Sequence, residues 1–280
     1  MPELPEVETV RRGLAATVSG CRMAAVRVRD VRLRQPVDPE ALQRLVGARV
    51  TAVGRRAKYL LLEMDTGAVL IIHLGMSGTL RVTHPEIELD RHDHVRWLFA
   101  GPGLAGDREL RYRDPRRFGL VLVSTRTQLQ THPLFCRLGP EPFDTEFSGQ
   151  YLWERSRKLR RPVKNLLMDA RMVAGIGNIY ASEALWRAGI HPARSARRIG
   201  LDRWDRLRRA CVEVLGDAIR QGGTTLNDFR DAAGDPGYFA VHLAVYGRSG
   251  RACPRAGCDG RIRRIVQAGR STFYCPRCQH

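Results

Sequence analysis

Apolar residues near the start of the chain recur at the spacing of one helical face. They are Leu4, Val7, Val10, Leu14 and Val18, each three or four positions from the next. Pro5 suits the first turn of such a helix, because the backbone N–H that proline lacks has no partner there. Glu6 and Glu8 suit the positive end of the helix dipole. The pattern therefore predicts a helix over residues 4–18, so that the start of the chain is held at a helix N-terminus.

The pattern changes between about residues 22 and 124. Apolar and β-branched residues form short runs there, and Gly, Pro or Asp separates several of them. The runs cover residues 26–33, 50–53, 59–64, 68–74, 95–99 and 118–123. Short strands divided by turns favour an antiparallel β-sandwich or barrel over a parallel sheet.

The second half of the chain is predicted to be helical. One helical face carries Leu207, Cys211, Val214, Leu215, Ala218 and Ile219, with Asp202 as the predicted N-cap. Proline and glycine in residues 131–150 predict a linker, and the glycine-rich segment 221–238 predicts a long loop that acts as a lid or binding loop. We therefore predict an α+β chain with an N-terminal β-domain (1–130), a linker (131–150), a helical domain (151–249) and a small terminal module (250–280).

The charge of the chain suggests a polyanionic partner. Its formal net charge is +18, whereas solubility requires a magnitude of only roughly 2–8 for a small domain. Nucleic acid is the first candidate; no long apolar run or lipidation signal supports a membrane. The basic residues are arginines except for Lys58, Lys158 and Lys164. A GC-rich genome explains such a bias, and against it each lysine hints that a compact ammonium is needed there.

Seven cysteines do not pair off, and the first ten residues contain two glutamates and no apolar signal-peptide core. We therefore expect a cytoplasmic protein with reduced thiols. Four residues separate Cys253 from Cys258, two separate Cys275 from Cys278, and 16 lie between the pairs. This spacing is typical of a tetrahedral thiolate zinc site, with disulfides or unrelated thiols as the alternative.

The zinc site predicted from this spacing is structural, because four thiolates leave no open position for a substrate. Between the two cysteine pairs, the sequence predicts two short strands that turn at Ala268 and Gly269. A module of about 30 residues buries too little apolar surface to fold alone, so one Zn²⁺ would hold it together.

Ten sequence blocks occur in one order along nearly the whole chain. They are MPELPEVETVRRGL, RRAKYLLLE, HLGMSG, HDHV, DPRRFG, GIGNIYASE, GGTTL, PGYF, VYGR and the cysteine tail. Together they resemble the formamidopyrimidine-DNA glycosylases, the bacterial 8-oxoguanine glycosylases. The resemblance implies an N-terminal β-sandwich preceded by a helix, then a helix–two-turn–helix domain with a zinc β-hairpin finger. Many relatives have two residues inside the first cysteine pair where this chain has four, which enlarges the knuckle but leaves four ligands.

The resemblance also implies the catalytic residues. The amine of Pro2, exposed once the initiator methionine is removed, would attack C1′ of the damaged nucleotide. The pKa of a chain-terminal amine lies far below that of lysine, so part of it is an unprotonated nucleophile at neutral pH. Glu3 would be the general acid/base, while Glu6 either stabilises the helix dipole or shares in catalysis. Lys58, predicted to begin a strand, would assist β-elimination, and Arg270 would bind phosphate and assist δ-elimination.

Six further residues are implied as DNA contacts: His73, Met76, His92, Arg116, Phe118 and Asn178. Met76, Arg116 and Phe118 would fill the gap left by an extruded nucleotide, although core packing is the alternative for Met76 and Phe118. Asn178 would bind phosphate and cap the helix that follows it. The segment 222–239 would close over the extruded base.

The function implied is base-excision repair. A bifunctional glycosylase and AP lyase would remove oxidised purines from double-stranded DNA through a Schiff base on Pro2, then cut the strand by β,δ-elimination. The protein would act as a monomer, because one free terminus serves one active site. An endonuclease VIII-like enzyme for oxidised pyrimidines is the nearest alternative, although its relatives usually carry glycine at the position of Leu4. A zinc-containing DNA-binding protein without catalysis is the second.

Overall fold

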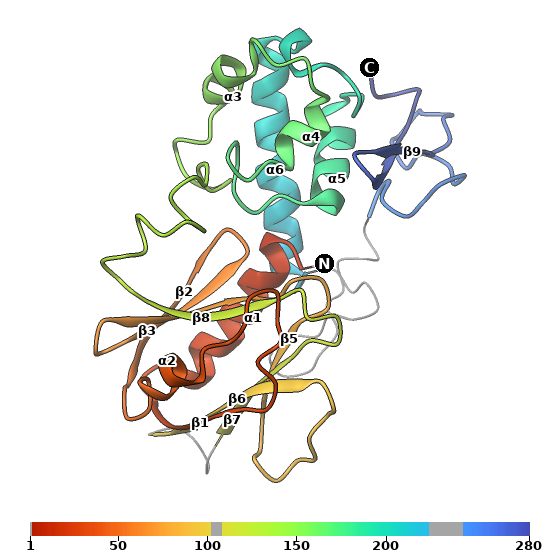
Figure 1. The fold of residues 1–280 in the computed structure, drawn as a ribbon. Helices are drawn as coiled ribbons and strands as arrows, with labels where there is room; N and C mark the ends of the chain where they lie inside the picture. Colours follow the sequence, from red (N-terminus) through yellow and green to blue (C-terminus); the bar gives the residue numbers. More distant parts are fainter. Residues whose placement is uncertain (1, 102–107, 224–242) are drawn as a thin grey trace. The chain divides into compact units, whose positions relative to one another are not determined.

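The computed structural model describes residues 2–101, 108–223 and 243–280 (Figure 1). The chain forms two compact units. One comprises Met1–Cys136 with Gln221–Tyr238, and the other comprises Arg137–Arg220 with Phe239–His280. Among the described residues, no helix combines the length and apolar composition needed to cross a membrane.

The first unit is a helix followed by two four-stranded antiparallel sheets. Helix α1 (Leu4–Val18) has the predicted bounds, and all five predicted apolar residues on its face are fully buried. The sheet orders are β1-β6-β7-β5 and β2-β3-β4-β8. The elements are β1 (Arg22–Val28), α2 (Pro39–Gln43), β2 (Val50–Arg56), β3 (Tyr59–Met64), β4 (Ala68–His73), β5 (Thr79–Thr83), β6 (Asp93–Ala100), β7 (Arg108–Arg113) and β8 (Leu120–Thr125).

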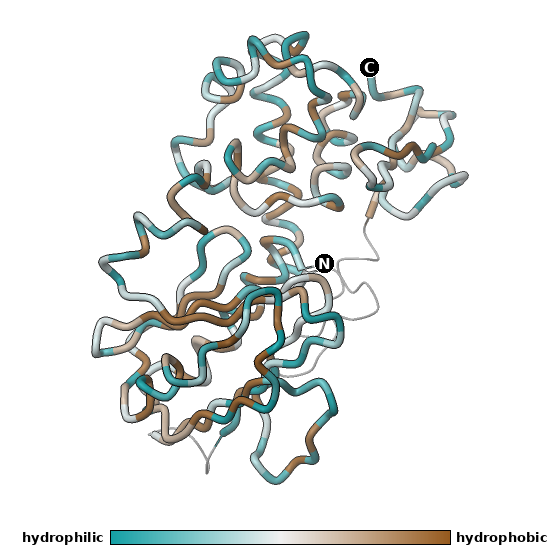
Figure 2. Tube along the Cα trace, viewed as in Figure 1, coloured by the Kyte–Doolittle hydropathy of each residue, from teal (hydrophilic) through white to brown (hydrophobic). Residues whose placement is uncertain are grey.

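One hydrophobic core joins the two sheets and α1. Trp97 and Tyr112 of the first sheet share it with Leu62 and Leu70 of the second and with Leu14 of the helix. Hydrophobic residues follow the strands of the second sheet in Figure 2, and four successive residues of β4 are buried. The predicted sandwich preceded by a helix is therefore confirmed.

The sequence did not predict strands β5 and β7. Strand β5 is short, and strand β7 is rich in charged residues. In β7, Arg111 is fully buried although it reads as a surface residue. Its guanidinium reaches the Glu109 carboxylate and donates to the carbonyls of Ile87 (2.7 Å) and Glu88 (3.0 Å). The first predicted strand begins earlier than expected, at Arg22, because Met23 is one of the residues that enter the core.

The second unit is helical, as predicted. It contains α3 (Gly149–Ser156), α4 (Val163–Leu167), α5 (Asn178–Ala188), the short η1 (Ala196–Arg198) and α6 (Leu201–Arg220) around Trp204. The predicted apolar face of α6 is buried, with Ile219 half-buried. The N-cap prediction for Asp202 is wrong, because α6 begins one residue earlier and Asp202 lies in its first turn. Its charge still lies at the positive end of the dipole.

Strands β9 (Arg263–Gln267) and β10 (Arg270–Tyr274) form the predicted hairpin. Ala268 and Gly269 connect them with φ of 47° and 72°. A two-residue hairpin loop with positive φ at both positions matches the twist of the flanking strands. The turn predicted at these two residues is therefore confirmed.

Candidate functional site

The start of the chain is held against the first turn of α1. Pro2 and Glu3 are both buried. The backbone N–H of Glu3 donates to the Glu6 carboxylate (2.8 Å), one half of a capping box. A Cβ at Gly223 would lie 3.2 Å from the Glu6 side chain, so Gly223 lies close to this turn. Glu6 therefore fixes the backbone beside Pro2, whatever else it does.

Lys58 lies in the two-residue turn between β2 and β3, not at the start of the strand as predicted. Arg55 braces the turn by donating to the Ala57 carbonyl (2.9 Å) and to the Glu8 carboxylate of α1 (3.2 Å). Burial raises the pKa of Glu8, but hydrogen bonds from Arg11, Arg12 and Arg55 outweigh it, and the pKa is lowered. An ionised Glu8 thus ties the Lys58 turn to the helix that begins beside Pro2.

His73 ends β4 and pairs with Tyr59, the residue after Lys58. Its Nδ1 accepts the backbone N–H of Gly75 (3.0 Å), so the proton of the neutral ring is on Nε2. Burial, followed by the charges of Arg34 and Lys58, lowers the pKa of His73 to about 4. At neutral pH this ring is an uncharged hydrogen-bond donor.

Asp114 joins two loops that lie far apart in the sequence. It is fully buried, and its carboxylate accepts hydrogen bonds from the Ser77 hydroxyl (2.7 Å), the backbone N–H of Gly119 (2.8 Å) and the Tyr112 hydroxyl (3.3 Å). We call Ser77, Tyr112, Asp114 and Gly119 the Asp114 hub. It fastens the HLGMSG loop to the DPRRFG loop.

Two glycines allow these loops to touch through their backbones. Gly75 has φ of 64°, and a Cβ there would lie 2.5 Å from the Gly119 nitrogen. A Cβ at Gly119 would lie 1.6 Å from the Tyr112 hydroxyl and 2.7 Å from the His73 carbonyl oxygen. Neither position accepts a side chain without moving a loop.

The hub presents an apolar and cationic group to solvent. Met76 and Phe118 are 41% and 46% exposed, so the core-packing alternative is wrong for both. The Arg116 guanidinium lies 5.0 Å from the centre of the Phe118 ring. The backbone N–H of Arg116 donates to the Ser77 hydroxyl (3.2 Å). The structure thus brings Met76, Arg116 and Phe118 together on two fastened loops.

The HDHV block supports the same hub. The ring of His94 donates from Nε2 to the Asp114 carbonyl (2.8 Å), and the Asp114 N–H donates to the His92 carbonyl (3.2 Å). His94 is buried, whereas His92 is half-buried and accepts from Arg91 on Nε2 (2.7 Å). Burial, then the charge of Arg91, lowers the pKa of His92.

In the second unit, Asn178 lies beside the hairpin. Gly177 is the N-cap of α5, so the capping role expected for Asn178 is wrong. Its amide Nδ2 instead donates to the Ser271 carbonyl (3.0 Å) and the Tyr246 hydroxyl (3.4 Å). Arg270 is exposed and directly precedes Ser271. The structure therefore brings Asn178 close to the start of β10, which carries Arg270.

The four predicted cysteines converge. The Sγ atoms of Cys253, Cys258, Cys275 and Cys278 all lie within 4.8 Å of one another. Cys253 and Cys278 are 3.8 Å apart, and Cys258 and Cys275 are 3.6 Å apart. Tetrahedral thiolates about 2.3 Å from a zinc ion stand about 3.8 Å apart, so the donor set and its spacing fit one Zn²⁺.

Known families match the chain in three consecutive parts. The descriptions are formamidopyrimidine-DNA glycosylase N-terminal domain (residues 1–121), formamidopyrimidine-DNA glycosylase H2TH domain (138–230), and zinc finger found in FPG and IleRS (250–280). A formamidopyrimidine-DNA glycosylase of Methylococcus capsulatus is 51% identical over 279 residues, covering 100% of both chains. The chain belongs to the formamidopyrimidine-DNA glycosylase family. A relative with the same name from Alkalilimnicola ehrlichii is 52% identical over 285 residues, also covering 100% of both chains.

Solved structures of the family agree with this assignment. A complex of the Lactococcus lactis Fpg with DNA containing an abasic site has a TM-score of 0.90 and 34% identity, and covers 100% of both chains. A complex of the wild-type enzyme with N7-benzyl-Fapy-dG-containing DNA gives the same values. The zinc-finger match spans the four converging cysteines, which confirms one structural zinc as the cofactor.

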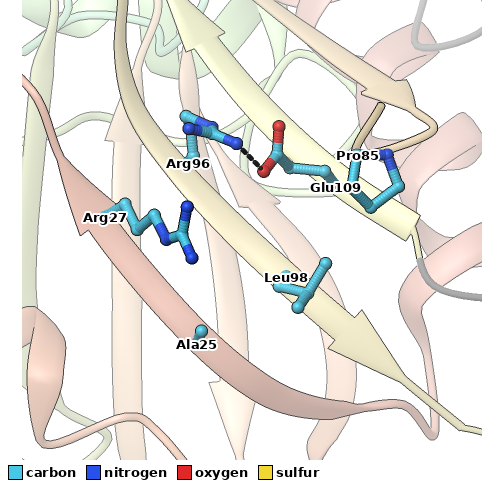
Figure 3. A pocket seen from close by; sticks show the side chains of 6 residues that line it. All are labelled: Ala25, Arg27, Pro85, Arg96, Leu98 and Glu109. Atoms are coloured by element: carbon cyan, nitrogen blue, oxygen red, sulfur yellow. Dashed lines mark hydrogen bonds and ion pairs between the residues drawn. The ribbon is translucent and has the colours of Figure 1, made fainter. Parts of the chain in front are cut away.

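The hollow in Figure 3 is separate from the residues that the family resemblance singles out. It lies on the outer face of the first sheet and is lined by Ala25, Arg27, Pro85, Arg96, Leu98 and Glu109. Arg96 and Glu109 form an ion pair there (2.6 Å), and Glu109 also pairs with the buried Arg111. As far as the described residues go, its lining includes none of the predicted site residues, so we interpret it as a structural ion-pair row.

Sequence reasoning missed the residues that hold the family's loops in place. Besides the Asp114 hub, the carboxylate of Glu183 accepts the backbone N–H groups of Ala244 (2.8 Å), Val245 (3.0 Å) and Tyr246 (2.8 Å). Burial raises the pKa of Glu183, while these hydrogen bonds oppose the rise. The available signal was an acidic residue inside a motif block, Asp114 in DPRRFG and Glu183 in GIGNIYASE.

The predicted loop 221–238 lies outside the described residues beyond Gly223.

The pKa of His73 predicts a pH dependence of stability. Between pH 6.5 and about 4 the unfolded chain binds a proton on this ring that the folded chain does not. The free energy of unfolding should therefore fall as the pH drops through this window, by up to about 1.4 kcal/mol per pH unit. His73→Asn, whose Oδ1 can replace Nδ1 as the acceptor, should flatten that slope in urea unfolding. Equal slopes in the native chain and in His73→Asn would contradict the assignment.

Proposed function

We propose that the protein is a bifunctional DNA glycosylase and AP lyase that removes oxidised purines from double-stranded DNA. The observation that carries the proposal is the exposed group of Met76, Arg116 and Phe118 on the Asp114 hub. Proteins that only bend DNA also insert apolar wedges, so the exposed Arg116 fixed beside the wedge is the part that favours base extrusion. An enzyme that extrudes a nucleotide needs a wedge that replaces lost stacking and a donor for the orphaned base.

The chemistry proposed for the N-terminus is nucleophilic catalysis by an amine. The Pro2 nitrogen attacks C1′, the bond from C1′ to the base breaks, and its electron pair leaves with the base, which takes up a proton. Opening of the sugar ring then gives an iminium, with Glu3 transferring the protons. Loss of a C2′ proton expels the 3′ phosphate by β-elimination, and δ-elimination expels the 5′ phosphate. Lys58 assists the first elimination and Arg270 the second.

Several residues bind and position the DNA, including two of those assigned to catalysis. We assign phosphate contacts to Lys58, Asn178 and Arg270, and further contacts to His73 and His92, with the charge of +18 supplying general attraction. When bound, the zinc holds the hairpin that carries Arg270 and supplies no reactive position. Closure of residues 222–239 over the extruded base stays a prediction from the resemblance.

The proposed function also suggests where the protein acts and how its chain is divided into domains. We infer that it acts as a monomer in the bacterial cytoplasm, associated with the nucleoid through DNA. Residues 1–130, 131–150, 151–249 and 250–280 are proposed as β-domain, linker, helical domain and zinc finger. In support, the two compact units divide after Cys136, and the zinc-finger match begins at residue 250.

Borohydride trapping tests the proposal. The purified protein should form a covalent adduct with a duplex containing 8-oxoguanine opposite cytosine when the iminium is reduced, and should cut that strand. A duplex with undamaged guanine is the control. Tight binding without an adduct would refute the lyase function. Faster cutting of thymine glycol than of 8-oxoguanine would favour the endonuclease VIII-like alternative, which the family assignment does not favour.

A further inference from the structure

Lys164 is an unusual residue in this chain. It is one of three lysines among 47 basic residues, and it is fully buried in α4. Buried lysines are rare unless their ammonium groups are hydrogen-bonded, because removing a charge from water is unfavourable. The proposed reaction assigns Lys164 no part, so the structure must supply another reason for it.

Within the described part of the chain, the ammonium of Lys164 donates to three oxygen atoms. Its Nζ donates to the side-chain oxygen of Asn178, to the Thr272 hydroxyl (2.7 Å) and to the Ser271 carbonyl (3.5 Å). An ammonium has three N–H donors that diverge from a single point, which suits acceptors gathered around it. A guanidinium spreads its donors over a larger planar fork and would not fit this buried position. The need for a compact cation explains why lysine is found here in an arginine-rich chain.

These contacts also orient Asn178. Because its side-chain oxygen faces Lys164, its Nδ2 must face the other way, toward Ser271 and Tyr246. A cation on the amide oxygen polarises the amide and strengthens its N–H donors. Lys164 thus fixes which end of the Asn178 amide donates. A phosphate contact would take the N–H that makes the longer bond, to Tyr246 (3.4 Å), while the bond to Ser271 stays.

The same contacts hold the hairpin. Thr272 and Ser271 follow Arg270 in β10, and both accept from Lys164. Two residues assigned to phosphate, Asn178 on α5 and Arg270 on β10, therefore share one buried anchor. A shift of β10 against α5 would break these hydrogen bonds.

We propose that Lys164 is a positioning residue that couples Asn178 to Arg270, so that the two bind the DNA backbone as a unit. This inference rests on the proposed function for the roles of Asn178 and Arg270. Lys164 itself does not touch DNA, because its side chain is buried. Its removal should uncouple the two contacts while the four zinc ligands remain.

A double-mutant cycle tests the coupling. The dissociation constant for a duplex with an abasic-site analogue is measured for Asn178→Ala, Arg270→Ala and the double variant, at one salt concentration. In the native background, the factor by which the double variant weakens binding should be at least about fivefold smaller than the product of the two single factors. In a Lys164→Met background, the effects should multiply to within about twofold. Independent effects in the native background, or coupling that survives Lys164→Met, would overturn the proposal.

Measurements without DNA separate this test from that of the proposed function. In Lys164→Met with one zinc per chain, hydrogen exchange of the backbone amides of residues 271–274 should accelerate. Lys164→Arg should behave like Lys164→Met, and Lys158→Met, at an exposed lysine, like the native chain. Native exchange in Lys164→Met or Lys164→Arg would overturn the proposal. If Lys164→Met fails to fold, Thr272→Val decides, because it removes one acceptor and leaves the cation; it should accelerate exchange and weaken the coupling.

Discussion

A chain that retains Met1 should bind a duplex containing 8-oxoguanine almost as tightly as the processed form, yet give no borohydride adduct. With Met1 in place, the Pro2 nitrogen is part of an amide, which has no free electron pair for attack on C1′. Loss of the nucleophile should lower trapping and strand cutting by about 10³-fold or more. Affinity should change little, because the residues assigned to phosphate and to the gap lie elsewhere in the chain.

The control for this experiment restores the nucleophile in the same preparation. Methionine aminopeptidase added to the Met1-retaining protein should expose Pro2 and recover the adduct in proportion to the methionine released. Mass spectrometry of the intact chain measures that fraction, and gel analysis of the reduced adduct measures trapping. A full-strength adduct from the unprocessed chain would place the nucleophile elsewhere, with the Lys58 amine as the next candidate.

The local features of the fold could be predicted from the sequence. Helix α1 and strand β3 have the predicted bounds, since apolar periodicity and a proline in the first turn are read within one segment. The cysteine spacing likewise predicted four thiolates that do converge. In each case the physical cause lies within a few residues or in a spacing that one small module must satisfy.

The contacts that hold the site could not be predicted in this way. Ser77 and Asp114 are 37 positions apart, and Lys164 and Thr272 are 108 positions apart. Each is a polar residue that sequence rules place at the surface, and each is buried because a distant partner satisfies its hydrogen bonds. Strand β7 was missed for the same reason, since the burial of Arg111 depends on carbonyl groups of the segment before β6.

The exposure of two apolar site residues could not be predicted from the sequence either. Met76 and Phe118 are apolar, and composition alone favours a place for them in the core. They are exposed because Gly75 and Gly119 bring two loops together and Asp114 fastens them. Single exposed apolar side chains are common, but two of them fixed beside a guanidinium form a surface suited to an apolar partner. The stacked bases of DNA are such a partner.

Removal of the zinc should weaken DNA binding strongly without unfolding the β-sandwich. The core of the terminal module is small: Val245, Cys253, Ile262, Phe273 and Cys275. Zinc binding to such modules contributes about 10–16 kcal/mol, so without it the hairpin should unfold and take Arg270 and the Ser271 contact of Asn178 with it. The sandwich has a separate core and should keep its thermal transition.

Affinity for abasic-analogue duplex, measured by fluorescence anisotropy, should fall about 100-fold or more in Cys258→Ser or after chelation, since two assigned phosphate contacts are lost. Cys136→Ser, at an exposed cysteine outside the cluster, should keep one zinc and native affinity. Native affinity in zinc-free protein would show that the hairpin contributes nothing to binding, and the phosphate role of Arg270 would then be wrong.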